Sequence, residues 1–323
     1  MKRILVTGAA GQIGTELVPA LLQRYEGAEV VATDIRDLQE PLPEGAEYRR
    51  LDCTDGAAVA GIVDEAGIDI IYHLAAILSA TAEGIPRKAW RVNMDGLYNG
   101  LEAAREQDVA VFTPSSIAAF GPETPPDPTP QDTVQRPRTI YGVSKVAGEL
   151  LADYYHARFG VDARGVRYPG LISHAAPPGG GTTDYAVEIF HAALLDGRYS
   201  CYLAADTQLD MMYMPDALRA AMELMDAPAA RLRHRNAFNV TAMQLTPERL
   251  ARSIREHIPG FEIAYDVDPE RQRIAESWPR RVDDSAAREE WGWAPEHDLP
   301  SMVEDMLTRL AHRLGVASPV GTA

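Results

Sequence analysis

The feature that most constrains the fold is an alternation of short apolar runs with longer segments of helical periodicity. Runs typical of strands occur at 3–7, 29–33, 69–75, 109–113 and 161–168. Apolar residues recur at helical spacing in segments 12–25, 90–107 and 141–160. Strands separated by helices pair in parallel through right-handed crossovers. The pattern therefore predicts an α/β fold of the Rossmann type, a doubly wound parallel sheet covered by helices on both faces.

The pattern loosens after Tyr168. We expect helices over 185–195, 283–293 and 300–315, a short strand at 236–240, and a helix that begins at Pro247 with Thr246 as its N-cap. The proline-rich segment 122–137 is interpreted as an ordered surface loop, because motifs flank it closely.

Composition excludes several classes of protein. A formal charge of −16 disfavours a nucleic-acid binder, and the 323 residues contain no apolar run long enough to span a membrane. The N-terminus reaches glycines too early for a secretory signal, which favours a cytoplasmic location. Cys53 and Cys201 are far apart, and the eight histidines form no ligand cluster with them, so no metal site is expected.

The segment "VTGAAGQIG" carries Gly8, Gly11 and Gly14 between the first strand and the first helix. Glycines there let the backbone approach a pyrophosphate, which the helix N-terminus attracts. Asp34, at the end of the second strand, accepts hydrogen bonds from ribose hydroxyls and favours NAD over NADP. Arg36 is a nearby cation that would suit the 2′-phosphate of NADP. The segment and its context therefore predict a dinucleotide cofactor, and they favour NAD over NADP.

Other contacts to this cofactor are expected at neighbouring turns and strand ends. Asp52, after the third strand, is placed to reach an adenine edge, and a helix N-cap region is the alternative interpretation. The remaining expected contacts are Gln12, Ile13, Ile35, Cys53, Leu74, Ala75, Ala76 and Tyr168. We therefore assign residues 1–170 to an NAD-binding domain, completed by about 214–242. Residues 171–213 and 243–323 are assigned to a smaller C-terminal substrate-binding lobe.

Tyr141 and Lys145 in "YGVSK" are four residues apart on a predicted helix and so share a face. A neighbouring ammonium stabilises a tyrosine phenolate, which makes the pair a candidate base. Ser116 ends a strand at the carboxyl edge of the sheet, where its hydroxyl would hold a substrate oxygen in line with Tyr141. Ser115 is the alternative to Ser116.

These motifs resemble the extended short-chain dehydrogenases/reductases. The resemblance is carried by "TGAAGQIG", "HLAA", "PSSIAAFG", "YGVSK", "RYPG" and the late "WGWAP". It implies that Ser116, five before Gly121, is catalytic and that Lys145 also binds the nicotinamide ribose. It further implies that Leu171 contacts the cofactor and that Asn93 occupies a helix-kink and proton-relay position.

The segments "RYPGLIS" and "PPGGGTTDYAVEIF" resemble more closely the short-chain-type L-threonine 3-dehydrogenases, which are metal-independent and use NAD. The resemblance implies oxidation of the L-threonine 3-hydroxyl to 2-amino-3-oxobutanoate. The carboxylate site would be formed by Gly180, Gly181, Thr182 and Thr183. Ser79 would contact the same ligand from the cofactor side. Trp278 either closes over the substrate or is an ordinary hydrophobic anchor, and Asp184 is interpreted as an N-cap.

Two other functions remain open at this point. The first is a nucleotide-sugar epimerase or dehydratase, for which "RLRHR" at 231–235 would supply cations, although a solvated turn is the simpler interpretation. The second is a non-catalytic NAD-binding regulator, which would have no need of the Tyr–Lys pair. The family resemblance also implies a homodimer formed through the helices that contain "LEAAREQ" and "LLADYYHARFG".

Overall fold

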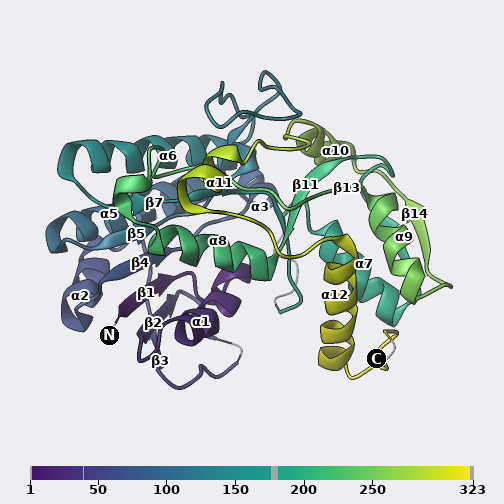
Figure 1. Ribbon diagram of the computed structural model, residues 1–323, viewed down its shortest axis with the longest axis horizontal. Helices are drawn as coiled ribbons and strands as arrows, with labels where there is room; N and C mark the ends of the chain where they lie inside the picture. The colour runs from purple at the N-terminus through teal and green to yellow at the C-terminus, as the bar shows by residue number, and fades with distance from the viewer. Residues whose placement is uncertain (1, 39, 176–180, 321–323) are drawn as a thin grey trace.

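The structure is a computed structural model that describes residues 2–38, 40–175 and 181–320 (Figure 1). Six parallel strands form the central sheet in the order β3-β2-β1-β4-β5-β7. Their bounds are Arg3–Thr7 (β1), Glu29–Asp34 (β2), Ala46–Arg50 (β3), Ile70–His73 (β4), Ala110–Phe112 (β5) and Ala163–Arg164 (β7). The expected doubly wound parallel sheet is confirmed.

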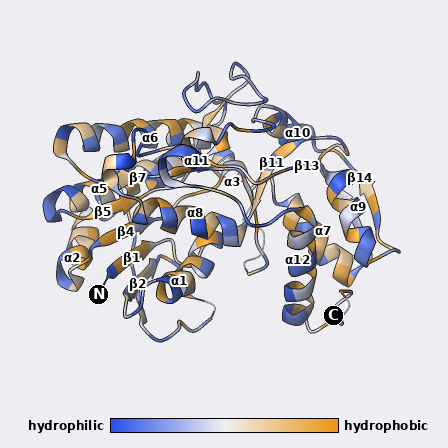
Figure 2. Cartoon of the chain, in the orientation of Figure 1, coloured by the Kyte–Doolittle hydropathy of each residue, from blue (hydrophilic) through white to orange (hydrophobic). Residues whose placement is uncertain are grey.

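Helices cover both faces of this sheet, and the first strand shows why the sequence requires them. Ile4 and Val6 pack on one side with α1 (Gln12–Arg24) and α8 (Met214–Asp226). Leu5 packs on the other side. The helices of that second side are α2 (Gly56–Ala66), α5 (Gly96–Gln107) and α6 (Ile140–Phe159). Because both faces are buried, the strand is a continuous apolar run rather than an alternating one (Figure 2).

Three smaller sheets lie outside the central sheet within the described residues, and one of them is at the outer edge of the second lobe (Figure 1). One has the order β12-β8-β6, with β6 at Ser115–Ser116, β8 at Val166–Tyr168 and β12 at Phe238–Asn239. Another has the order β13-β11-β9, with β9 at Gly170–Ile172, β11 at Leu209–Tyr213 and β13 at Met243–Leu245. The parallel pair β10 (Arg198–Cys201) and β14 (Glu262–Tyr265) is the third.

The second lobe is largely helical. Its helices are α7 (Tyr185–Leu195), α9 (Pro247–His257), α10 (Pro269–Glu276) and α12 (Leu299–Leu314), and α11 (Ser285–Trp291) packs back toward β12. The short helices α3 (Ser79–Gly84) and α4 (Pro86–Trp90) lie between β4 and α5. The expected start of α9 is confirmed, because the Thr246 hydroxyl accepts a hydrogen bond from the Arg249 amide at 3.1 Å.

Two expected elements are interrupted. The single strand expected over 161–168 is wrong, because β7 pairs with β5 whereas β8 pairs with β6 and β12. Gly165 separates them at a point where a Cβ atom would lie 2.3 Å from the Thr113 carbonyl oxygen, so only glycine permits this change of sheet. The helix expected over 90–107 contains a π-helical turn at Arg91–Asp95. The proline-rich loop is ordered, since Gln131 accepts a 2.8 Å hydrogen bond from the Asn239 amide.

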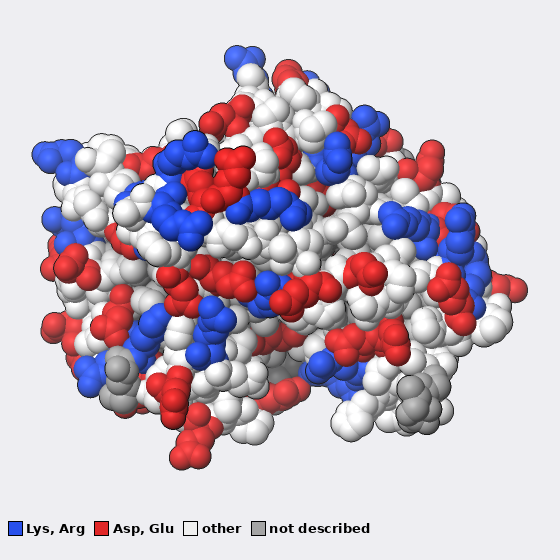
Figure 3. Space-filling view, in the orientation of Figure 1, with Lys and Arg blue, Asp and Glu red and all other residues white. Residues whose placement is uncertain are grey.

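The surface carries both signs of charge. On the face in Figure 3, Lys and Arg side chains are interspersed with Asp and Glu rather than gathered into a basic track. None of the helices within the described residues is long and apolar enough to cross a membrane. Within the same residues, no three His, Cys, Asp or Glu side chains are grouped in a way that would hold a metal ion.

Candidate active site

A cavity of ≈ 940 Å³ runs along the carboxyl ends of β1, β2 and β4 and continues toward the second lobe. This edge of a doubly wound sheet is where ligands of such folds bind. Of the residues named from the sequence that the structure describes, every cofactor, catalytic and substrate candidate lines this cavity except Asn93. The expected contact from Gly180 lies outside the described residues.

The glycine turn has the shape of an anion cradle. Gly8 has a φ of +74°, and a Cβ atom on Gly14 would lie 2.4 Å from the Gly8 carbonyl oxygen, so both positions require glycine. At Gly11 a Cβ atom would meet only that oxygen, at 3.1 Å, and would otherwise project into open space. The Nε2 atom of Gln12, at the start of α1, is buried without a hydrogen-bond partner in the described part of the chain. The turn therefore fits a bound pyrophosphate.

Asp34 and Arg36 form one hydrogen-bonded unit at the end of β2. The Asp34 carboxylate accepts hydrogen bonds from the Ala10 amide at 3.1 Å and from the Arg36 amide at 3.0 Å. The Arg36 guanidinium donates to Asp34 at 3.2 Å and to the Ala10 carbonyl at 2.9 Å. The Arg36 guanidinium is therefore hydrogen-bonded to Asp34, the residue that is expected to face the ribose.

Asp52 lies in the cavity wall but does not cap a helix. Its carboxylate accepts hydrogen bonds from the Thr54 amide and hydroxyl at 2.9 and 2.8 Å, and these bonds hold its pKa below the usual range. The N-cap of α2 is Asp55, which accepts a hydrogen bond from the Ala58 amide at 3.1 Å. The interpretation of segment 51–55 as a helix N-cap region is thus confirmed, with Asp55 as the capping residue.

Ser116, Tyr141 and Lys145 converge where β6 meets the first turns of α6. Burial raises the pKa of Tyr141 to about 12, and a hydrogen bond with the Ser116 hydroxyl opposes this rise. Lys145 lies with its Nζ 5.4 Å from the centre of the Tyr141 ring and donates a 2.7 Å hydrogen bond to the Pro114 carbonyl. Burial lowers the pKa of Lys145 to about 8, and the Glu149 carboxylate opposes that shift. A hydroxyl, a phenol and an ammonium group thus lie close together in the wall of the cavity.

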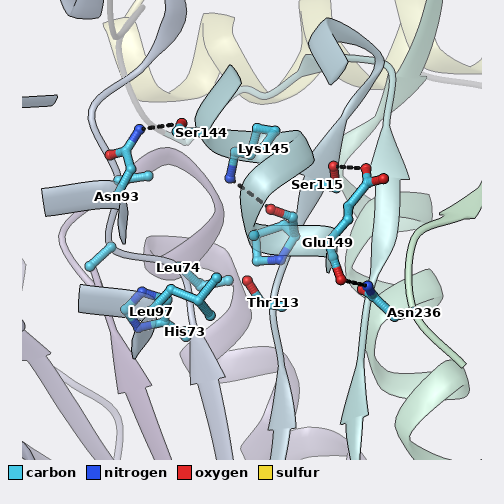
Figure 4. Close-up of a pocket in the computed structure, with 14 residues that line it drawn as sticks. His73, Leu74, Asn93, Leu97, Thr113, Ser115, Ser144, Lys145, Glu149 and Asn236 are labelled. Atoms are coloured by element: carbon cyan, nitrogen blue, oxygen red, sulfur yellow. Dashed lines mark hydrogen bonds between the residues drawn. The ribbon is translucent and has the colours of Figure 1, made fainter. Parts of the chain in front are cut away.

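Ser115, the alternative to Ser116, is already committed to another partner. Its hydroxyl donates to the buried carboxylate of Glu149 (Figure 4). Glu149 also accepts hydrogen bonds from Arg167 at 3.0 and 2.8 Å. Gln135 adds a further bond to Glu149 at 2.7 Å. This buried network was not found in the sequence, although Glu149 follows Lys145 by four residues and therefore shares its helix face.

Asn93 lines a separate cavity of ≈ 30 Å³ behind Lys145 (Figure 4). Its side chain donates to the Ser144 hydroxyl at 3.2 Å and accepts from the Ile77 amide at 2.8 Å. Asn93 lies in the π-helical turn and so joins that turn to α6 and to the segment after β4. His73 lines the same small cavity, and burial lowers its pKa to about 4.

The far end of the large cavity reaches the second lobe. Thr182 is fully buried, and its hydroxyl has no hydrogen-bond partner among the described residues. Asp184 occupies the N-cap position of α7 and accepts a 2.8 Å hydrogen bond from the Gly181 amide. Trp278 is both a wall of the cavity and a member of the apolar cluster of the lobe, so its two interpretations are compatible.

The cations of "RLRHR" lie elsewhere. Arg233 and His234 contact Glu289 and Glu290, and Arg235 contacts Asp162. None of the segment lines the cavity. The cavity does include Arg313 from α12, which sequence reasoning missed and which forms a 2.7 Å ion pair with Glu40.

This fold and this site define a dinucleotide-binding protein of the short-chain dehydrogenase/reductase type, with a glycine turn and a Ser–Tyr–Lys set at the carboxyl edge of the sheet. The model of the NAD dependent epimerase/dehydratase family matches residues 4–241, and the chain belongs to this family.

Similar proteins of nearly the same length are known. An L-threonine dehydrogenase from Clostridium difficile is 53% identical, with a TM-score of 0.94 and 99% of each chain covered. A monomeric L-threonine 3-dehydrogenase from a metagenome is 45% identical, with a TM-score of 0.90, covering 96% of this chain and 99% of that one. An uncharacterized epimerase/dehydratase of Staphylococcus haemolyticus is 52% identical over 97% of this chain and 99% of its own. The resemblance to L-threonine 3-dehydrogenases is confirmed.

Proposed function

We propose that this protein oxidises the 3-hydroxyl of L-threonine to give 2-amino-3-oxobutanoate, with NAD as the cofactor. The observation that carries the proposal is one cavity that contains both the Ser116–Tyr141–Lys145 set and the Thr182–Thr183 segment. A chain 53% identical over its whole length is named an L-threonine dehydrogenase, which supports the choice of substrate.

The cofactor would be held by the glycine turn at its pyrophosphate and by Asp34 at its adenosine ribose. When bound, NAD supplies a hydride acceptor. The Asp34 carboxylate disfavours the extra phosphate of NADP, and the guanidinium of Arg36 is already bonded to Asp34 and to the Ala10 carbonyl. Lys145 is placed to bind the nicotinamide ribose.

Tyr141 acts as the base. Its phenolate takes the proton from the substrate 3-hydroxyl while the hydrogen on C3 leaves with its electron pair, so that the C–O bond becomes a carbonyl. Burial disfavours the phenolate. The Lys145 ammonium, whose Nζ lies 5.4 Å from the centre of the Tyr141 ring, is the cation that would stabilise it. The Ser116 hydroxyl orients the substrate oxygen toward Tyr141.

Recognition of the amino acid falls to short polar groups at the end of the cavity. The hydroxyls of Thr182 and Thr183 are donors for the substrate carboxylate, and Ser79 approaches from the cofactor side. The buried Thr182 hydroxyl would then gain the partner that burial demands. Trp278 forms the apolar wall.

We propose that the chain is divided into two domains, one for the cofactor and one for the substrate. We assign residues 1–170 and about 214–242 to the NAD-binding domain, because α8 packs on α1 and β12 pairs with β8. Residues 171–213 and 243–323 form the substrate-binding lobe, and the cavity lies between the two parts. We assign the enzyme to the cytoplasm.

A homodimer is proposed through α5 and α6. Their outer faces expose Tyr98, Val143, Leu150, Tyr154 and Phe159, and Leu150 is 63% exposed. Clustered exposed apolar side chains on two adjacent helices are typical of an interface. A similar protein is described as monomeric, so the proposed dimer is tested by measuring the oligomeric state of this protein in solution.

The proposal is tested by following NADH formation with a panel of 3-hydroxy amino acids. UDP-sugars are incubated with the protein and NAD and analysed by chromatography, because an epimerase or dehydratase regenerates its NAD and yields no net NADH. We expect turnover with L-threonine and none with the sugars, because Arg233, His234 and Arg235 are paired with acidic residues and no residue of 231–235 lines the cavity. Turnover of a UDP-sugar without turnover of threonine would replace the proposal with the epimerase alternative.

A further inference from the structure

Helices α3 and α6 are joined at the active site by one side chain. The Glu83 carboxylate of α3 accepts a 2.8 Å hydrogen bond from the backbone amide of Ile140, the first residue of α6. The first N–H groups of a helix have no partner within the helix. The Thr139 hydroxyl accepts from the Gly142 amide at 3.0 Å, so a local cap and a distant carboxylate share this turn. The next residue after Ile140 is Tyr141.

The same short helix presents a substrate candidate. Ser79, the first residue of α3, is buried and lines the large cavity, and Glu83 follows it by four residues. Side chains four apart share one face of a helix. Ala82 is fully buried in the apolar cluster that also contains Tyr141, so α3 packs closely beside the catalytic turn.

A helix as short as α3 has little stability of its own. Its six residues begin at Ser79, and the N-cap residue Leu78 contributes no side-chain hydrogen bond. Its place therefore depends on tertiary contacts, of which the charge-assisted bond from Ile140 to Glu83 is the directional one. Glu83 does not line the cavity, so we do not expect it to contact the substrate.

We propose that Glu83 is a positioning residue that fixes Ser79 relative to Tyr141, and this inference rests on the proposed threonine oxidation. The carboxylate holds the start of α6, and the helix that carries it holds Ser79. The distance between the substrate-binding hydroxyl and the base is thereby set by this bond together with the packing of Ala82. Loss of the bond leaves both groups present but lets α3 shift relative to the base.

The test is a kinetic comparison of Glu83 variants in the full-length protein. Glu83→Ala is expected to raise the KM for threonine about tenfold, with a smaller fall in kcat, because misplacement of a substrate contact weakens binding and alignment. Glu83→Gln keeps an oxygen acceptor and is expected to restore most of the wild-type KM. The dissociation constant for NADH should be unchanged in both variants. Glu26→Ala, at the exposed turn after α1, is the matched control.

A double-mutant cycle separates positioning from general destabilisation. If Glu83 acts through Ser79, then Glu83→Ala should change the KM less than twofold in a Ser79→Ala background. If Glu83→Ala fails to fold, Glu83→Asp, which withdraws the carboxylate by one methylene, replaces it in the same cycle. A wild-type KM in Glu83→Ala, or in Glu83→Asp where that variant replaces it, overturns the inference, and so does an equal effect in the Ser79→Ala background. A wild-type protein with no threonine turnover overturns the proposed function instead, so the two failures are distinct.

Discussion

Replacement of Gly11 by alanine separates cofactor binding from folding. Gly11 is the N-cap of α1 with φ −88° and ψ 176°, a conformation that alanine adopts without strain. A Cβ atom there would meet only the Gly8 carbonyl oxygen, at 3.1 Å. The loss of a favourable N-cap residue costs about 0.5–1 kcal/mol of stability, so the variant is expected to fold.

The methyl group would instead occupy the space into which the pyrophosphate fits. Overpacking a fitted contact costs about 1–3 kcal/mol, which corresponds to a roughly 5- to 150-fold weaker NADH complex. Gly14→Ala is the contrasting variant, because its Cβ atom would lie 2.4 Å from the Gly8 carbonyl oxygen and 2.6 Å from the Ala9 Cα. This backbone clash should lower the melting temperature before any cofactor is added.

The assay combines thermal unfolding of the free protein with NADH titration followed by fluorescence. We expect Gly11→Ala to melt within a few degrees of the wild type and to bind NADH weakly, and Gly14→Ala to melt early. Wild-type NADH affinity in a folded Gly11→Ala protein would refute the placement of the pyrophosphate at this turn.

Two further predictions concern stability and assembly. Burial lowers the pKa of His73 to about 4 against about 6.5 in an unfolded chain, so stability present above pH 6.5 is lost as pH falls toward 4. The free energy of unfolding is therefore expected to fall by about 2 kcal/mol between pH 7 and pH 5 because of His73. Urea unfolding at the two pH values should show this fall in the wild type and not in His73→Asn. The same pH dependence in both proteins would contradict the reasoning. Leu150→Glu on the exposed face of α6 should convert a dimer to a monomer in light scattering without loss of helical signal, whereas a monomeric wild type would remove the proposed interface.

The parts of the fold that the sequence predicted are those encoded by local patterns. Periodicity or a required glycine was enough to predict three elements that are adjacent in the chain: the first strand, the glycine turn and α1. The helix over Tyr185–Leu195 is likewise a single run, largely apolar and mostly buried. Segment 161–168 misled the prediction because its eight residues suit two short strands as well as one. The close approach of Gly165 to Thr113, which separates the two strands, arises only from the tertiary structure.

The supporting groups of the site were not predictable for the same reason. Glu149 meets Arg167, and Glu83 meets Ile140, only after the topology brings separate elements together. The sequence contains no spacing that relates Glu83 to a helix that begins 57 residues later. In contrast, Tyr141 and Lys145 share one helix face, so their proximity follows from the helical repeat alone.

The central claim is that Tyr141 removes the proton of the threonine hydroxyl beside a bound nicotinamide. It is tested most directly by the rate of NADH formation from NAD and L-threonine in the wild type and in Tyr141→Phe, with NADH affinity measured for both. The account predicts that turnover disappears while NADH affinity stays within about twofold, because the phenol is absent and the glycine turn is intact. Near-normal turnover in Tyr141→Phe would contradict it.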